Sequence, residues 1–193
     1  KKLKFKLGEK SFVVAFHPVT NSKFSSKDQF EQLLMALDHY PGIDFIFTYP
    51  NSDPDNKIIR LMIDEFVLTK ARSIAFESLG SEIFLSLLST VDGIIGNSSC
   101  GLLEAPTFKI ATVNIGERQE GRIKSLSIID CPPKKEKIIN SISKVYTKEF
   151  QKKLEKVKNP YGNGGASEKI FTILKSLELD KLSKKEFYDL EVK

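Results

Sequence analysis

The sequence contains no tryptophan and only two cysteines and two histidines. Two cysteines, Cys100 and Cys131, are too few for the disulfide framework of a small secreted domain, so we expect a reducing, cytoplasmic environment. Cys100 is expected to be a small buried residue. No cluster of histidine, cysteine and acidic residues has the spacing of metal ligands, and we therefore expect neither a metal nor another cofactor.

Long apolar runs are also missing. The longest, such as residues 12–16, fall far short of the roughly 20 residues that cross a membrane, so no membrane partner is expected. The 30 basic residues exceed the 25 acidic ones, but few of them are arginines and aromatic side chains are not interleaved with them. This composition favours a solvated, lysine-rich surface over a nucleic-acid site.

The sequence does contain apolar segments that alternate between two periodicities. With 193 residues, 40% of them hydrophobic, the chain can form one globular domain that spans residues 1–193. Strands are expected at 11–16, 43–48, 73–76, 93–96 and 110–113, and helices at 27–39, 56–66, 81–88, 101–105, 136–146, 148–157 and 167–177. The alternation predicts an α/β fold, a Rossmann-like parallel sheet with helices on both faces.

A sheet of this kind binds its ligand in the crevice at the carboxyl ends of the strands. Polar or donor-rich segments follow every predicted strand, and they contain His17, Asn51, Leu79, Ser98, Ser99 and Arg118. This coincidence predicts a ligand site along that edge of the sheet.

The segment at 96–101, Gly-Asn-Ser-Ser-Cys-Gly, stands between a predicted strand and a short predicted helix. A serine there can simply cap the helix, but capping does not explain a second serine or the flanking glycines. The hydroxyls of Ser98 and Ser99, beside the N–H groups of a helix start, can bind a diphosphate. Glu104 would lie about 7 Å further along the helix, near the ribose of the same nucleotide. Nucleotide binding and plain capping both stay open at this point.

The other candidate residues allow more than one interpretation. Neither Ser98 nor Ser99 completes the G-x-S-x-G pattern of a hydrolase elbow, and no acid is placed to orient His17. His17 could cap its own loop or donate to a phosphate or sugar oxygen. Arg118 is either a surface residue or a charge-assisted donor to the diphosphate. The glycine-rich residues 162–165 lack the Lys-Ser/Thr of a phosphate-binding loop.

Five segments in order along the chain resemble one family. They are His-Pro-Val-Thr at 17–20, Tyr-Pro-Asn at 49–51, and residues 96–106, 114–122 and 159–170. Together, over about residues 12–177, they resemble the C-terminal domain of the hydrolysing UDP-N-acetylglucosamine 2-epimerases of sialic-acid and legionaminic-acid synthesis. That family is similar to two-domain glycosyltransferases of the B type, whose second Rossmann-like half holds the nucleotide.

The resemblance implies a role for each matching residue near the diphosphate. Ser98 and Ser99 would hold the diphosphate, Glu104 would hold the ribose hydroxyls, and Arg118 would contact the phosphates. His17 would lie beside the phosphate and the sugar bond that breaks, as the catalytic residue of this chain.

The resemblance also implies residues that surround the base. Asn51 and the backbone at Leu79 would line the uracil and ribose pocket. Arg122 matches one of the motifs, but no role is assigned to it.

The reaction that the resemblance implies is anti elimination of UDP followed by addition of water. Its products would be UDP and N-acetylmannosamine, or an analogous diacetamido sugar. Members of the family are longer than this chain, and the acids that move protons on the sugar come from their N-terminal domain. We therefore expect a C-terminal domain that, on its own, binds nucleotide weakly and turns over little substrate.

The expected partners are UDP, a UDP-amino-sugar substrate and the N-terminal domain of the same enzyme, and a homo-oligomer is one option. Two alternatives stay open. The chain could be the donor-binding half of a B-type glycosyltransferase, or a non-catalytic module that binds a nucleotide sugar or a nucleic acid.

Overall fold

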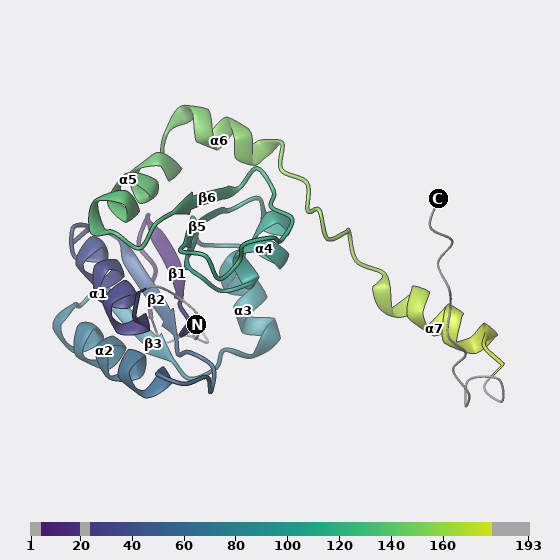
Figure 1. Cartoon of the computed structure of the whole chain (residues 1–193). Coiled ribbons are helices and arrows are strands. Elements are labelled where there is room, and N and C mark those ends of the chain that lie inside the picture. Colours follow the sequence, from purple (N-terminus) through teal and green to yellow (C-terminus); the bar gives the residue numbers. More distant parts are fainter. Residues whose placement is uncertain (1–4, 20–23, 179–193) are drawn as a thin grey trace, which may run out of the picture. The chain divides into compact units, whose positions relative to one another are not determined.

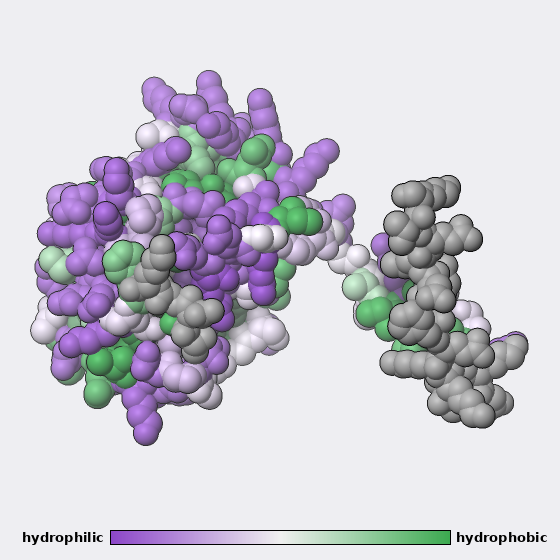
Figure 2. All heavy atoms as spheres, in the orientation of Figure 1, coloured by the Kyte–Doolittle hydropathy of each residue, from purple (hydrophilic) through white to green (hydrophobic). Residues whose placement is uncertain are grey.

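The computed structural model describes residues 5–19 and 24–178 of the chain (Figure 1). The chain divides into two compact units, Lys1–Tyr161 and Gly162–Lys193. The face of the first unit in Figure 2 is mostly hydrophilic, as expected for a solvated lysine-rich surface. None of the helices in the described ranges combines the length and the apolar character that a membrane crossing needs.

The first unit is built on a six-stranded parallel sheet with the strand order β3-β2-β1-β4-β5-β6. Its strands are β1 (Ser11–Ala15), β2 (Asp44–Thr48), β3 (Ser73–Phe76), β4 (Gly93–Gly96), β5 (Ala111–Ile115) and β6 (Ile128–Cys131). The structure confirms the first five strands, and their first and last residues lie close to the predicted ones. We did not predict β6, because no helix lies between it and β5, so the alternation on which the prediction relied stops there.

The helices also follow the prediction. They are α1 (Ser26–Leu37), α2 (Asn56–Thr69), α3 (Gly80–Leu88), α4 (Cys100–Leu103), the 3-10 helix η1 (Ala105–Phe108), α5 (Lys135–Val145), α6 (Lys148–Glu155) and α7 (Ala166–Ser176). The predicted helix at 101–105 is the one that changes, because α4 ends at Leu103 and continues as η1. Pro106 explains this change, since proline has no N–H to continue the α-helical hydrogen bonds.

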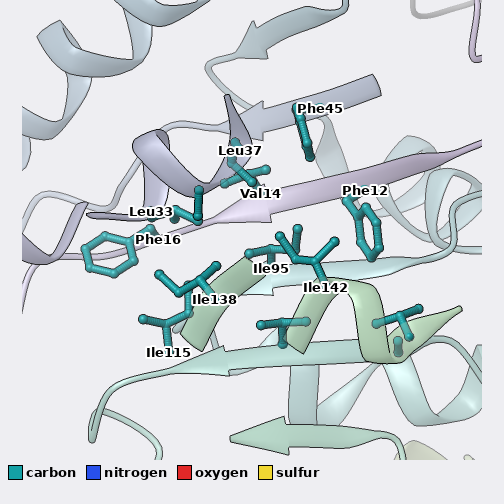
Figure 3. Close-up of a cluster of buried hydrophobic side chains, with 14 of the residues drawn as sticks. Phe12, Val14, Phe16, Leu33, Leu37, Phe45, Ile95, Ile115, Ile138 and Ile142 are labelled. Atoms are coloured by element: carbon teal, nitrogen blue, oxygen red, sulfur yellow. The ribbon is translucent and has the colours of Figure 1, made fainter. Parts of the chain in front are cut away.

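Apolar side chains fill both faces of the sheet, and β1 shows how the sequence achieves this. Phe12 and Val14 point to one face and Val13 and Ala15 to the other, as the alternation of a strand requires. The first face packs against residues of α1, α2, α5 and α6 (Figure 3), and the second against residues of α3 and η1. The predicted α/β, Rossmann-like sheet with helices on both faces is therefore confirmed.

The strand order reverses between β1 and β4. From β1 the chain moves outward through β2 and β3, and it then returns to the other side of β1 with β4. Ala15 pairs with Gly96, so the two strands end at the same level. The segments that follow them, from His17 and from Asn97, leave the sheet side by side at the point where folds of this type bind ligands.

In the second unit, α7 confirms the helix predicted at 167–177. None of the residues of α7 is buried in the described structure. Its exposed apolar side chains include Ile170, Phe171, Ile173 and Leu174.

Candidate functional site

His17 follows β1 and is half-buried. Its Nδ1 accepts a hydrogen bond from the backbone N–H of Asn51 at 3.2 Å, and its Nε2 lies 3.3 Å from the Ser98 hydroxyl. A ring nitrogen that accepts an N–H bond carries no proton, so neutral His17 holds its proton on Nε2 and donates it to Ser98. Burial, followed by the positive charge of Arg118, lowers the pKa of His17. At neutral pH this ring is therefore an uncharged donor.

Asn97, which we did not predict as a site residue, fixes the backbone of His17. The Asn97 side chain accepts from the His17 N–H at 2.7 Å and donates to the His17 carbonyl at 2.8 Å. The Asn97 carbonyl in turn accepts from Arg118 Nη1 at 3.2 Å and from Gln119 Nε2 at 2.8 Å. The sequence signal that could have identified Asn97 is a polar residue directly after an apolar predicted strand.

Ser98 and Ser99 are both half-buried at the start of α4. Ser99 occupies the N-cap position, but its side chain makes no capping hydrogen bond, so plain capping accounts for neither serine. The backbone hydrogen bonds of this turn begin with the N–H of Gly101, and the N–H groups of Ser99 and Cys100 take no part in them. Because α4 is a single turn, its dipole adds little, and attraction for an anion must come from these individual donors.

The glycines that flank the serines have a structural explanation. A Cβ atom on Gly96 would lie 2.1 Å from the Ala15 carbonyl oxygen, and one on Gly101 would lie 2.4 Å from Thr112 Cγ2. Thr112 also donates a 2.8 Å hydrogen bond to the Gly101 carbonyl. Close packing of β4 on β1, and of α4 on β5, therefore requires both glycines, and they are no evidence for a nucleotide.

Glu104 lies at the junction of α4 and η1. Its Oε2 atom is buried and has no hydrogen-bond partner among the described residues. Burial raises the pKa of this carboxyl group. Because buried polar groups are normally hydrogen-bonded, an unpaired carboxylate oxygen suggests a donor that a ligand supplies.

Arg118 lies on the loop between β5 and β6 and is half-buried. Apart from the bond of its Nη1 to the Asn97 carbonyl, its guanidinium has no hydrogen bond to a described residue. It therefore retains several N–H donors for an anion.

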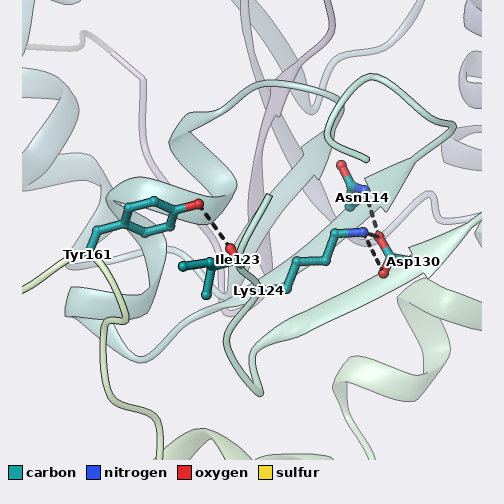
Figure 4. Close-up of polar contacts among 5 residues, drawn as sticks. All are labelled: Asn114, Ile123, Lys124, Asp130 and Tyr161. Carbon is teal, nitrogen blue, oxygen red and sulfur yellow. Dashed lines mark hydrogen bonds and ion pairs between the residues drawn. The ribbon is translucent and has the colours of Figure 1, made fainter. Parts of the chain in front are cut away.

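Hydrogen bonds and an ion pair hold the part of the Arg118 loop that leads into β6 (Figure 4). Lys124 Nζ lies 2.9 and 3.0 Å from the two carboxylate oxygens of Asp130, and Asn114 Nδ2 donates to Asp130 at 2.6 Å. The Tyr161 hydroxyl donates to the Ile123 carbonyl at 3.0 Å. The last of these contacts gives Tyr161 a structural role at this loop.

The remaining predicted residues are less closely connected. Asn51 is exposed and reaches His17 through its backbone, while its side-chain amide donates to Asp53 at 2.7 Å. Leu79 follows β3, two strands away from β1, and its side chain is buried in the core of the second face. Arg122 is exposed on the loop after β5. The structure thus groups His17, Ser98, Ser99 and Arg118 around Asn97, with Leu79 further away.

A pocket of about 410 Å³ lies at the carboxyl ends of β5 and β6. Gly116, Glu117, Lys124 and Asp130 belong to its lining, which includes none of the predicted nucleotide-binding residues. Apart from Leu79, which is buried, those residues are half-buried or exposed.

The cysteines should be unreactive in the folded chain. Burial raises the pKa of the Cys100 thiol to about 11, and it raises that of Cys131 to about 11 as well. Since the thiolate is the reactive form, iodoacetamide at pH 7.5 should label both cysteines in urea but leave both unlabelled in the folded chain, as followed by mass spectrometry. Rapid labelling of Cys100 in the folded chain would contradict this expectation.

Comparison with known proteins identifies the family of the chain. The family described as UDP-N-acetylglucosamine 2-epimerase matches residues 1–175. Polysialic acid biosynthesis protein P7 of Escherichia coli is 37% identical over 182 residues, which cover 93% of this chain and 46% of that protein. The GDP/UDP-N,N'-diacetylbacillosamine 2-epimerase (hydrolyzing) of Campylobacter jejuni is 34% identical over 192 residues, which cover 98% of this chain and 50% of that protein.

Solved structures share the fold. The UDP-GlcNAc 2-epimerase of Neisseria meningitidis, solved bound to UDP-GlcNAc, superimposes with a TM-score of 0.69 at 23% identity, over 86% of this chain and 45% of that one. The chain spans about half the length of the curated relatives it matches. On the match to residues 1–175, the chain belongs to the UDP-N-acetylglucosamine 2-epimerase family.

Proposed function

We propose that this chain is the nucleotide-binding half of a hydrolysing UDP-N-acetylglucosamine 2-epimerase that acts in the cytoplasm. In this proposal residues 1–193 bind UDP, and an N-terminal domain of a longer, two-domain enzyme supplies the acids that move protons on the sugar. The hydrolysing relative from C. jejuni and the Neisseria structure that holds UDP-GlcNAc support the choice of reaction and of ligand.

One observation carries the proposal. Hydrogen-bond donors lie at the point where the strand order of the sheet reverses, and the short helix α4 that begins there ends at Glu104, whose buried Oε2 has no partner among the described residues. The donors are the hydroxyls of Ser98 and Ser99, the Nε2–H of His17 and the free N–H groups of Arg118. Donors suit a pyrophosphate, and a carboxylate suits the hydroxyl groups of a ribose.

These groups would assist the elimination of UDP. When the bond between the sugar and the β-phosphate oxygen breaks, negative charge develops on the departing diphosphate. Arg118 would stabilise that charge, and the Nε2–H of His17, which donates to Ser98 in the free chain, would turn to a diphosphate oxygen. The Ser98 hydroxyl, which bonds the Cys100 thiol in the free chain, would turn to the same diphosphate. The base that takes the proton from the second carbon, and the addition of water, belong to the proposed N-terminal domain.

A glycosyltransferase half would hold its nucleotide in a similar way, but the family match favours the epimerase. Product analysis with the longer protein separates the two. Free N-acetylmannosamine, or its diacetamido analogue, is expected from UDP-sugar and water alone, whereas a transferase would release a glycosylated acceptor.

The binding proposal predicts that UDP stabilises this chain against heat. At a concentration of 100 times the dissociation constant, a ligand adds about 2.7 kcal/mol, which corresponds to a rise of roughly 5–10 °C in melting temperature for a domain of this size. Uridine, which lacks the diphosphate, should give a much smaller rise in the same fluorescence-monitored melt. An equal response to uridine and UDP would show that the diphosphate is not held.

A further inference from the structure

Asn97 is the most fully hydrogen-bonded residue of the site, and no role has been assigned to it so far. Its side chain is fully buried, with 0% of it exposed. Both of its amide atoms bond the backbone of His17, and its own carbonyl accepts from Arg118 and Gln119. Its N–H donates to the Ala15 carbonyl at 3.1 Å. One residue thus joins the segments that follow β1, β4 and β5, through its side chain to His17 and through its backbone carbonyl to Arg118 and Gln119.

We propose that Asn97 is a positioning residue, which holds His17 and Arg118 on the two sides of the diphosphate position. This inference rests on the proposed function, because it presumes that UDP occupies the site.

The contacts show how such positioning would work. With its backbone held at both the N–H and the carbonyl, His17 cannot turn away from the sheet edge. That constraint keeps Nδ1 on the Asn51 N–H and Nε2 on the Ser98 hydroxyl, which fixes the nitrogen that carries the proton. The Asn97 carbonyl accepts from Nη1 of Arg118 and so orients the guanidinium. The other N–H donors of Arg118 stay available for the phosphates. Binding groups that are held in place before the ligand arrives cost less to order when it binds.

A buried asparagine could equally tie three loops together for stability alone. The two roles differ in what they predict for the His17 ring. A purely stabilising residue can be removed at a cost in stability while the ring keeps its hydrogen bonds. Removal of a positioning residue must change the ring. Without Asn97, Nδ1 of His17 is no longer held on the Asn51 N–H, and the ring proton can move from Nε2 to Nδ1.

The test compares three variants of the full chain, labelled with ¹⁵N. Asn97→Ala removes both contacts to His17, and Asn97→Asp keeps the size of the side chain but loses the donor to the His17 carbonyl. Asn114→Ala is the matched control, because Asn114 is also buried at the carboxyl end of a central strand but contacts Asp130 instead of the site. The ring nitrogens of His17 are followed by NMR, with the exposed His39 as an internal reference, and UDP affinity is measured by calorimetry.

Both Asn97 variants should move part of the His17 proton from Nε2 to Nδ1. Each should also raise the dissociation constant for UDP by at least about tenfold, the loss expected for one charge-assisted hydrogen bond. The Asn114→Ala chain should melt earlier but keep the wild-type ring signals of His17. The Asp variant keeps the test valid if the Ala variant does not fold, because it preserves the size of the buried side chain.

Two results would overturn the inference. One is an unchanged His17 ring in the Asn97 variants, and the other is a His17 ring that changes as much in Asn114→Ala as in the Asn97 variants. A wild-type chain that binds no UDP would instead contradict the proposed function, and the ring signals, which need no ligand, would still decide whether Asn97 holds His17.

Discussion

Replacing Glu104 by glutamine should weaken UDP binding and, at the same time, raise the melting temperature of the unliganded chain. In the free chain the Glu104 carboxylate is partly desolvated, and one of its oxygens has no partner among the described residues. A neutral amide of similar shape removes the cost of burying that charge. The same change removes a charged acceptor for the ribose hydroxyls, which should weaken binding by about 10–100-fold.

The stabilising effect should depend on pH. Because burial raises the pKa of Glu104 above its ordinary value of 4.5, the folded chain binds this proton more tightly than the unfolded chain does. Glu104 therefore costs no stability below pH 4.5, where both states are protonated, and its cost grows as the pH rises through the raised pKa. The difference in melting temperature between Glu104→Gln and wild type should accordingly increase from pH 4 to pH 7.

Glu155→Gln is the control for this prediction. Glu155 is an exposed carboxylate at the end of α6, so its replacement should not change UDP affinity. If Glu104→Gln binds UDP as tightly as Glu155→Gln in titration calorimetry, Glu104 does not contact the nucleotide.

Replacing Gly96 by alanine should give the largest loss of stability, roughly 3–5 kcal/mol in the free energy of unfolding. Gly96 has a φ of +139°, which alanine rarely adopts, and its added Cβ would lie 2.1 Å from a main-chain oxygen of β1. Neither strand can move away without breaking the pairing of Ala15 with Gly96, which places Asn97 beside His17.

Alanine variants of two other glycines, compared by urea denaturation, separate the two causes of this loss of stability, which are backbone strain and the steric overlap of the added Cβ. Gly121 has a φ of +75° but open space around it, so Gly121→Ala should show the backbone strain alone, about 1 kcal/mol. Gly42 has open space and no positive φ, so Gly42→Ala should be nearly neutral. If Gly96→Ala loses no more stability than Gly121→Ala, the close approach of β4 to β1 is not needed for the fold.

The periodicity of the sequence predicts most of the fold because the core depends on it directly. In β1, alternate apolar residues face the two layers of helices, and the prediction follows from that pattern. β6 could not be predicted in this way, since a loop without a helix precedes it and its Asp130 is exposed. Pro106 was visible in the sequence and could have signalled the early end of α4.

The site was predictable only in part, for a physical reason. The ends of parallel strands meet at one edge, so His17, Ser98 and Arg118 could be expected to lie near one another. The contacts that give them chemical meaning join residues about 80 positions apart, such as His17 and Asn97, and no local pattern reveals them. The flanking glycines looked like features of a phosphate site, but packing alone requires them.

The central claim is that UDP binds where β1 and β4 end, and an NMR titration of the ¹⁵N-labelled chain with UDP tests it most directly. We expect the largest changes in amide signals at residues 97–104, at His17 and at Arg118. Signals that change instead around Lys124 and Asp130, beside the 410 Å³ pocket, would contradict it. So would a spectrum that shows no change in the signals of residues 97–104 at saturating UDP.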